Sequence, residues 1–178
     1  IVNKIGYPVI LKATAGGGGR GMRVVKSESD LKNAIEITMQ EAANAFGNDQ
    51  IYIEKYIENP KHIEIQVVGD GKGNAIHLGT RDCSMQRRHQ KIIEEAPAPD
   101  VDINNLQSLL NASVNLCKEI KYKGVGTLEF LYEKNKFYFI EMNTRIQVEH
   151  PVTEMITGFD LVKAQLRIAL DLGIKLNQ

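Results

Sequence analysis

The chain has 178 residues, 43% of them hydrophobic, and its 22 basic and 22 acidic residues give a formal net charge of zero. This length is enough for one large domain or two small lobes with their own cores. The balanced charge argues against partners drawn by a global field, such as nucleic acid or a membrane surface, and no apolar run approaches the roughly 20 residues that span a bilayer.

A glycine-rich hairpin is predicted near the start of the chain. Residues 7–12 form an apolar strand that ends in Lys12, and residues 22–25 form a return strand. The loop between them holds four consecutive glycines, Gly16, Gly17, Gly18 and Gly19. Such a run is typical of a backbone that approaches a ligand or of a moving lid. With Lys12 and Arg20 nearby, its N–H groups would suit a polyphosphate, and the alternative is a flexible tip.

A helix and a third strand are predicted to follow the hairpin. The helix covers residues 27–46, because apolar residues recur there at helical spacing. Ser27 or Ser29 is its expected N-cap, and Gly47 is its stop signal. Residues 51–57 then alternate like a strand.

The rest of the chain mixes strands and helices. Strands are predicted over residues 62–68, 75–78, 126–132 and 137–142, with helices over 104–120 and 160–172. The predicted fold class is α+β. We expect a small lid lobe over residues 1–57 and a metal- and anion-binding lobe over residues 58–178, with a nucleotide between them.

A metal site is predicted where two neighbouring strands carry carboxylates. Residues 137–140 are expected to form a buried strand, and Glu141 follows it. Glu129 lies in the preceding strand. Two such carboxylates repel each other unless a cation lies between them, and Mg²⁺ prefers oxygen ligands. Asn143 lies two residues after Glu141 and is expected on the same face.

The next polar residues point to an anion site. Arg145, Gln147 and Glu149 continue the alternation if the chain stays extended, which would present a cation, an amide and a carboxylate to one side. Such a set could hold a small oxyanion and take a proton from it. The alternative is a solvated polar loop.

Basic residues and a cysteine mark the middle of the chain. Residues 87–91 are too few and lack the aromatic residues expected of a nucleic-acid patch, so phosphate or carboxylate contacts are favoured. Cys83 is predicted to be a small buried residue. With Cys117 as the second of two cysteines, the chain lacks a disulfide framework, which is typical of a reducing compartment.

Together these segments resemble the ATP-grasp core of biotin carboxylase, closest to the bacterial or plastid-type subunit of acetyl-CoA carboxylase. The resemblance rests on the glycine-rich segment 12–22, on residues 54–57, on residues 81–91 and on residues 141–153. It runs over essentially the whole chain. The family's domains before and after this core are absent here, so we expect the sequence to be a piece of a longer polypeptide with little or no turnover by itself.

The resemblance implies a role for each motif residue. The residues expected to bind nucleotide or substrate are Lys12, Gly16, Gly17, Gly18, Gly19, Glu54, Lys55, Ile57, His62, Gln86, His89, Gln147 and Val148. Glu129, Glu141 and Asn143 would bind two Mg²⁺ or Mn²⁺ ions. Lys91, Arg145 and Gln147 would seat bicarbonate, and Glu149 would remove its proton. Bicarbonate would attack the γ-phosphate of ATP to give carboxyphosphate, whose CO₂ would be transferred to biotin.

Partners also follow from the resemblance. It implies a biotin carboxyl carrier protein or domain, a carboxyltransferase, a homodimer of the full-length protein, and fatty acid biosynthesis in the cytoplasm, with the plastid stroma or mitochondrial matrix as alternatives. Two rival functions are another ATP-grasp ligase, such as a carbamoyl-phosphate synthetase, and a non-catalytic nucleotide-binding module. The combination of residues 85–91 with residues 145–150 argues against the first, and the complete set of motif residues argues against the second.

Overall fold

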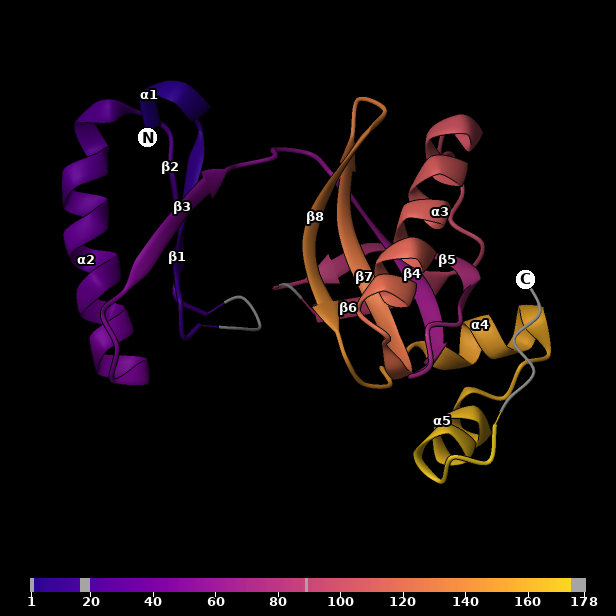
Figure 1. The fold of residues 1–178 in the computed structure, drawn as a ribbon. Helices are drawn as coiled ribbons and strands as arrows, with labels where there is room; N and C mark the ends of the chain where they lie inside the picture. The colour runs from indigo at the N-terminus through magenta and orange to yellow at the C-terminus, as the bar shows by residue number, and fades with distance from the viewer. Residues whose placement is uncertain (1, 17–19, 89, 174–178) are drawn as a thin grey trace. The chain divides into compact units, whose positions relative to one another are not determined.

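The computed structural model describes residues 2–16, 20–88 and 90–173, which cluster into two compact units. Unit 1 comprises Ile1–Glu58 with Arg87–Gln90, and unit 2 comprises Asn59–Gln86 with Lys91–Gln178. Both units combine helices with antiparallel strands, which confirms the predicted α+β class (Figure 1). Gly17, Gly18, Gly19 and His89, which the sequence placed at the candidate site, lie outside the described residues.

Unit 1 is a three-stranded antiparallel sheet with a long helix. Its elements are α1 (Val2–Ile5), β1 (Val9–Ala13), β2 (Met22–Val25), α2 (Glu28–Phe46) and β3 (Ile51–Lys55), and the strand order is β2-β1-β3. Val9 and Leu11 alternate along β1 and are fully buried, where they form a core with Val25 of β2 and Ala34 of α2. The predicted hairpin is confirmed, whereas α1 was not predicted.

The ends of α2 test the predicted caps. Gly47 adopts a left-handed conformation with φ of 69°, and its N–H donates to the carbonyl of Ala43, as the stop signal predicts. Ser27 is the N-cap residue, but its hydroxyl bonds Ser29 and Asp30 side chains instead of a backbone N–H of the helix. The predicted position is therefore right, and the predicted capping bond is absent at this described end.

Unit 2 is built on a five-stranded sheet. Its elements are β4 (Lys61–Asp70), β5 (Ala75–Arg87), β6 (Gln90–Glu95), α3 (Ile103–Glu119), β7 (Lys123–Glu133), β8 (Lys136–Asn143), α4 (His150–Thr157) and α5 (Leu161–Ala169). The strand order is β6-β5-β4-β7-β8. Strand β5 is much longer than predicted, and β6 and α4 were not predicted from the sequence.

The two faces of this sheet differ in chemistry. On one face, α3 packs its buried Leu110, Val114 and Cys117 on Ile65, Val67, Leu128 and Phe130 (Figure 1). On the other face, α5 covers Val68 and Val125 at one end, and the polar residues of β4 and β7 occupy the rest. Strand alternation therefore sends one set of side chains into an apolar core and the other toward a polar cluster. Among the described residues, no helix is both long and apolar enough to span a membrane.

The prediction of a buried strand over residues 137–140 is wrong in its burial. Tyr138 is 40% exposed and Phe139 is 58% exposed. Strand β8 is an edge strand of the five-stranded sheet and has β7 as its one neighbour there, so its side chains are only partly covered.

Candidate functional site

Four charged residues form a row across the sheet of unit 2. The strand register places Arg81 of β5 opposite Glu64 of β4, Glu64 opposite Glu129 of β7, and Glu129 opposite Glu141 of β8. Directly opposed side chains start about 5 Å apart at Cβ. Three carboxylates in such a row destabilise the sheet unless cations neutralise them. The row is therefore where counter-charges are expected.

Lys91, at the start of β6, supplies one counter-charge. Its Nζ donates to Glu64 Oε2 at 2.6 Å, to Glu129 Oε1 at 2.8 Å and to Glu149 Oε1 at 2.6 Å. Burial by itself would lower the pKa of Lys91, but these carboxylates outweigh it and raise the pKa well above its ordinary value. Lys91 is therefore a fixed ammonium that joins the predicted proton acceptor, Glu149, to a predicted metal ligand, Glu129.

Arg81 supplies the second counter-charge and is fully buried. Its Nε donates to Glu64 Oε1 at 2.5 Å. Its Nη1 and Nη2 bond four further side-chain oxygens, those of Gln66 (2.8 Å), Thr153 (2.7 Å), Thr127 (3.3 Å) and Gln147 (3.4 Å). All five partners of the guanidinium are buried. A buried charge is tolerated when its hydrogen bonds are satisfied in this way.

Two of the three carboxylates bound by Lys91, those of Glu129 and Glu149, are held ionised. Burial would raise the pKa of Glu129, but hydrogen bonds from His62 and Lys91 lower it to about 2. Burial would likewise raise the pKa of Glu149, but its hydrogen bond with Lys91 and the nearby charges lower it below the ordinary value. Both groups are therefore carboxylates at neutral pH, available to bind a cation or to accept a proton.

His62 connects Glu129 to Gln86. Its Nε2 lies 2.9 Å from Glu129 Oε2, and its Nδ1 lies 3.1 Å from Gln86 Nε2. An amide nitrogen donates, so Nδ1 of His62 accepts from Gln86. The structure thus brings His62 and Gln86, two residues predicted from the sequence, together in unit 2.

The segment after β8 does not stay extended, so the predicted alternation of Arg145, Gln147 and Glu149 is wrong. Gln147 and Glu149 are buried, but Arg145 is exposed and its Nη1 donates to the backbone carbonyl of Ile146. Val148 is 91% exposed. Strand β8 ends at Asn143, and Glu149 is the N-cap of α4 with φ of −79° and ψ of 1°, so the chain is not a strand where the pattern predicted one.

The three predicted metal ligands lie together. Asn143 Nδ2 donates to Glu129 Oε1 at 3.0 Å and to Glu141 Oε1 at 3.3 Å. The connected network holds four carboxylates, those of Glu64, Glu129, Glu141 and Glu149, against the two cations of Lys91 and Arg81. Its balance is thus two negative charges, which one divalent cation would neutralise. Carboxylate and amide oxygens are the ligands that Mg²⁺ prefers, so the residues fit such an ion.

A different group of side chains could also hold a metal ion. His62, Glu64 and Glu129 offer ligand atoms within 4.8 Å of one another. Lys91 already binds both of those carboxylates. A metal ion there would displace an ammonium, so the Glu129, Glu141 and Asn143 set is the better candidate.

The predicted nucleotide contacts of unit 1 have partners of their own. Lys12 on β1 forms an ion pair with Glu54 on β3. Lys55 Nζ donates to the carbonyls of Gly6 and Tyr7 at 3.1 and 2.9 Å. Lys12 and Glu54 are thus brought together, whereas the ammonium of Lys55 points to the chain segment before β1.

Five buried polar residues of the network were not singled out from the sequence. They are Glu64, Gln66, Arg81, Thr127 and Thr153. A signal existed for the first two, because His62, Glu64 and Gln66 alternate along one strand and so share a face. No local pattern distinguished Thr153, which reaches the cluster from α4 and bonds Arg81 across 72 positions of sequence.

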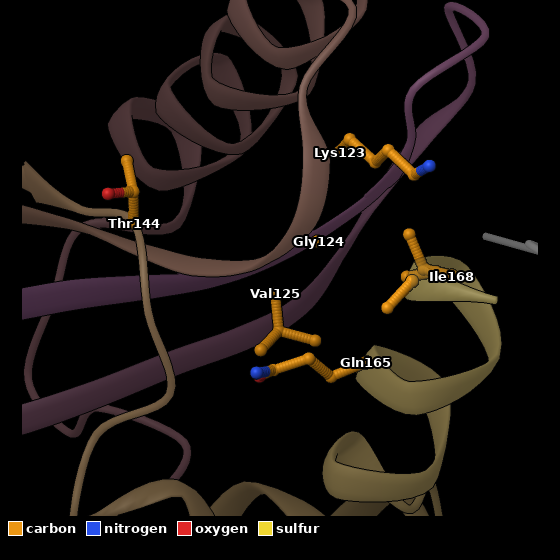
Figure 2. A pocket seen from close by; sticks show the side chains of 7 residues that line it. Lys123, Gly124, Val125, Thr144, Gln165 and Ile168 are labelled. Atoms are coloured by element: carbon orange, nitrogen blue, oxygen red, sulfur yellow. The ribbon is translucent and has the colours of Figure 1, made fainter.

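A separate pocket lies at the other end of β7. It has a volume of about 360 Å³ and is lined by Lys123, Gly124, Val125, Thr144, Gln165, Ile168 and Ala169 (Figure 2). Among these described lining residues none is a member of the charged network. Figure 2 shows Val125 and Ile168 beside Gln165 of α5, so the pocket is mainly a groove beside a packed helix.

Comparisons with known proteins agree with this geometry. The family model for the ATP-binding domain of the carbamoyl-phosphate synthase L chain matches residues 1–178. The biotin carboxylase of Haemophilus influenzae is 62% identical over 178 residues, which is all of this chain and 40% of that protein. The pyruvate carboxylase of Bacillus subtilis is 57% identical over 164 residues, which is 92% of this chain and 14% of that protein. The chain thus spans about two fifths of the biotin carboxylases it matches.

Solved structures show the same fold. A biotin carboxylase from Campylobacter jejuni superposes with a TM-score of 0.92 at 55% identity, covering 100% of this chain and 40% of that one. The biotin carboxylase domain of Hydrogenobacter thermophilus 2-oxoglutarate carboxylase, solved with MgADP and bicarbonate, gives 0.90 at 54% identity and covers 99% and 39%. The predicted resemblance and the predicted ATP-grasp fold are therefore confirmed.

Proposed function

The chain belongs to the family defined by the ATP-binding domain of the carbamoyl-phosphate synthase L chain, and from this we propose that it binds ATP and, in its full-length protein, carboxylates biotin with bicarbonate. The observation that carries the proposal is Lys91. Its ammonium bonds Glu149, the candidate base, and Glu129, a candidate metal ligand, with distances of 2.6 and 2.8 Å. Proton removal and phosphate activation would thus share one network.

A divalent cation is proposed at Glu129, Glu141 and Asn143. Asn143 would coordinate it through Oδ1, which requires its amide to turn, because Nδ2 now faces both carboxylates. When bound, the cation would neutralise negative charge that develops on the phosphates. The H. thermophilus domain was solved with a magnesium salt of ADP, which supports the choice of Mg²⁺.

We propose that the residues matching the family's nucleotide motifs contact the nucleotide. They are Lys12, the glycines of the predicted loop, Glu54, Lys55, Ile57, His62 and Gln86. Lys12 would contact phosphate oxygens, since an ammonium forms charge-assisted hydrogen bonds with them. The ion pair with Glu54 holds the side chain of Lys12 in place.

Bicarbonate is proposed to lie beside Lys91, Gln147 and Glu149, where Arg145 and the backbone of Val148 would join them. Lys91 and the amide of Gln147 would donate to its oxygens, and ionised Glu149 would take its proton. The bicarbonate oxygen then forms a bond to the γ-phosphorus of ATP as the bond to ADP breaks. Glu149 lies within 2.6 Å of Lys91, which keeps its carboxylate in a single place and favours this transfer.

The resulting carboxyphosphate would release CO₂ and phosphate. We propose that this phosphate takes the proton of the biotin ureido nitrogen and leaves a biotin enolate, which Arg145 stabilises. The ureido nitrogen then forms the new bond to CO₂. Arg145 is exposed, and its Nη1 donates to the neighbouring backbone carbonyl of Ile146, so most of its guanidinium is available to a substrate. The partners would be a biotin carrier protein or domain and a carboxyltransferase of acetyl-CoA carboxylase type.

The proposal is tested by measuring ADP release from the full-length natural protein with Mg-ATP and bicarbonate, with and without free biotin. We expect biotin to raise the rate. Glu149→Gln should lower this rate roughly 10²- to 10⁴-fold, because it removes the proton acceptor. Glu119→Gln, at the exposed end of α3, is the matched control and should match the wild-type rate.

Two results would contradict the proposed reaction, and a third would contradict only the role of Glu149. ADP release that does not respond to biotin would indicate a different acceptor, as in another ligase of this family. Nucleotide binding without ADP release would indicate a non-catalytic module. Wild-type activity in Glu149→Gln would leave the carboxylation in place but remove Glu149 from the role of base.

A further inference from the structure

Arg81 has no part in the proposed chemistry, yet it is the most enclosed cation of the network. The side chain is fully buried, as is that of Glu64, its ion-pair partner. Charge balance for Glu64 alone would need a single contact, and Lys91 already supplies one at 2.6 Å. The guanidinium instead bonds five side chains from β4, β7, the loop after β8, and α4.

One of these bonds fixes the orientation of Gln147. Arg81 Nη2 lies 3.4 Å from Gln147 Oε1, and Gln147 Nε2 donates to Glu129 Oε1 at 2.8 Å. A guanidinium can donate and cannot accept, so the amide oxygen must face Arg81. The amide N–H₂ is therefore directed to the carboxylate side of the cluster, where it can donate to an anion.

A second bond fixes α4. Arg81 Nη1 donates to the hydroxyl of Thr153 at 2.7 Å, and Thr153 is 1% exposed. Glu149 is the N-cap of this helix, four residues earlier. One helical turn is 3.6 residues, so Thr153 lies about one turn from Glu149 and a rigid short helix joins the two. The bond between Arg81 and Thr153 thus ties the carboxylate of Glu149 to the sheet.

We propose that Arg81 is a positioning residue for the bicarbonate site, because it sets the amide of Gln147 and, through Thr153, the placement of Glu149. This inference rests on the proposed function. A purely structural role explains the buried guanidinium of Arg81 less well, because apolar residues of similar volume often stabilise a core as well as a buried ion pair does, or better. The five directed bonds of Arg81 hold polar groups in fixed places, and two of those bonds lead to residues that would touch the substrate.

The test removes the bond to Thr153 and leaves every charge in place. In the full-length natural protein, Thr153→Val deletes one hydroxyl at nearly constant volume, and Thr153→Ser keeps that hydroxyl. Thr157→Val is the matched control, because Thr157 is on the same helix and its hydroxyl bonds the carbonyl of Thr153 and the N–H of Phe159. The readouts are kcat/KM for bicarbonate, KM for Mg-ATP and the melting temperature.

For Thr153→Val we expect kcat/KM for bicarbonate to fall roughly 10- to 100-fold, since a displaced catalytic group costs rate steeply. KM for Mg-ATP should stay unchanged, and Thr153→Ser should restore the rate. Arg81→Lys, which keeps the charge but lacks the planar fork, should show the same loss of kcat/KM.

Equal kcat/KM values for bicarbonate in Thr153→Val and Thr157→Val would overturn the inference. A Thr153→Val variant with a raised KM for Mg-ATP and a lowered melting temperature would also overturn it, because the damage would then be general. If the wild-type protein forms no ADP with bicarbonate, the proposed function fails first and the positioning role falls with it. If the wild type is active and Arg81→Lys remains folded with wild-type kcat/KM, the inference alone fails.

Discussion

Lys91 shows how one side chain can hold a cluster of like charges together. Its Nζ bonds three carboxylates, and burial of these groups would otherwise favour their neutral form. Removing one partner of such a buried pair leaves an uncompensated charge, which typically costs about 3–5 kcal/mol. The residues that would do the chemistry are therefore also residues on which the stability of unit 2 depends.

The pKa of Glu129 predicts how stability depends on pH. The pKa falls from 4.5 to about 2 on folding, so the folded protein binds this proton less tightly than the unfolded chain. The stabilisation is therefore present above pH 4.5 and is lost as the pH falls toward 2. We expect the free energy of unfolding of the metal-free protein to lose about 3 kcal/mol through this group over that window. Urea denaturation at a series of pH values measures it.

Lys91→Met provides the comparison for this pH dependence. Without the ammonium, the pKa of Glu129 should move up, and the loss of stability between pH 4.5 and 2 should be smaller than in the wild type. Identical pH profiles in the two proteins would show that Lys91 does not hold Glu129 ionised.

The two candidate metal carboxylates should respond differently to substitution. Glu141 is exposed, so Glu141→Gln should change the free energy of unfolding by less than about 0.5 kcal/mol. It should still weaken Mg²⁺ binding at least about 10-fold, because it removes a charged ligand. Calorimetric titration with Mg²⁺ and a non-hydrolysable ATP analogue measures this, and Glu119→Gln is the control. Unchanged affinity in Glu141→Gln would exclude Glu141 as a ligand.

At the scale of single elements, α3 and α2 form a natural pair for testing helix capping. The side chain of Asp102 accepts from the N–H of Asn105 at the start of α3, at 2.9 Å. Asp102→Ala should therefore cost about 1 kcal/mol. Ser27, at the start of α2, makes no such bond, so Ser27→Ala should cost clearly less. Chemical denaturation measures both, and equal costs would contradict the assignment of the caps.

The pairing of the edge strand β8 with β7 decides where the candidate metal ligands lie. Strand β8 carries Glu141 and Asn143 and pairs with β7 through the register that sets Glu129 opposite Glu141. A slip of one residue would turn both side chains to the other face. The register shifts between Glu129 and Phe130, and beyond this irregularity Phe137 packs against Phe130 and Tyr132, with ring centroids 6.2 and 4.6 Å apart.

At the scale of the whole molecule, each unit has a hydrophobic core of its own. We therefore expect calorimetric unfolding of this 178-residue chain to show two transitions, because separate cores unfold as separate cooperative units. The carboxylates of the candidate metal site all lie in unit 2. Adding Mg²⁺ should raise the melting temperature of one transition, and chelation should reverse the shift.

Glu141→Gln is the control for this prediction, because it should abolish the shift while leaving both transitions in place. A shift of both transitions by Mg²⁺, or a shift that persists in Glu141→Gln, would contradict a metal site confined to the predicted carboxylates of unit 2.

The sequence by itself determined the fold class, most of the elements and the fact that Glu129, Glu141 and Asn143, the candidate metal ligands, lie together. Those features depend on local chemistry: periods of 2 and 3.6 in the apolar residues, glycine at a helix end, and carboxylates on two consecutive strands joined by a short turn. Glu129, Glu141 and Asn143 come together because the hairpin between β7 and β8 is itself a local structure.

Only the tertiary structure decided which polar residues form the network around them. Arg81, Glu64 and Lys91 lie on β5, β4 and β6, and Thr153 lies on α4, so their contacts depend on strand order and on helix packing. The alternation predicted through Arg145 also failed, because β8 ends at Asn143. The chain turns into α4 at Glu149, and the fully buried guanidinium that holds this helix is supplied by a strand 72 residues away from Thr153. Long-range pairings of this kind have no signal in a local pattern, because the residues that meet share neither a turn nor a period.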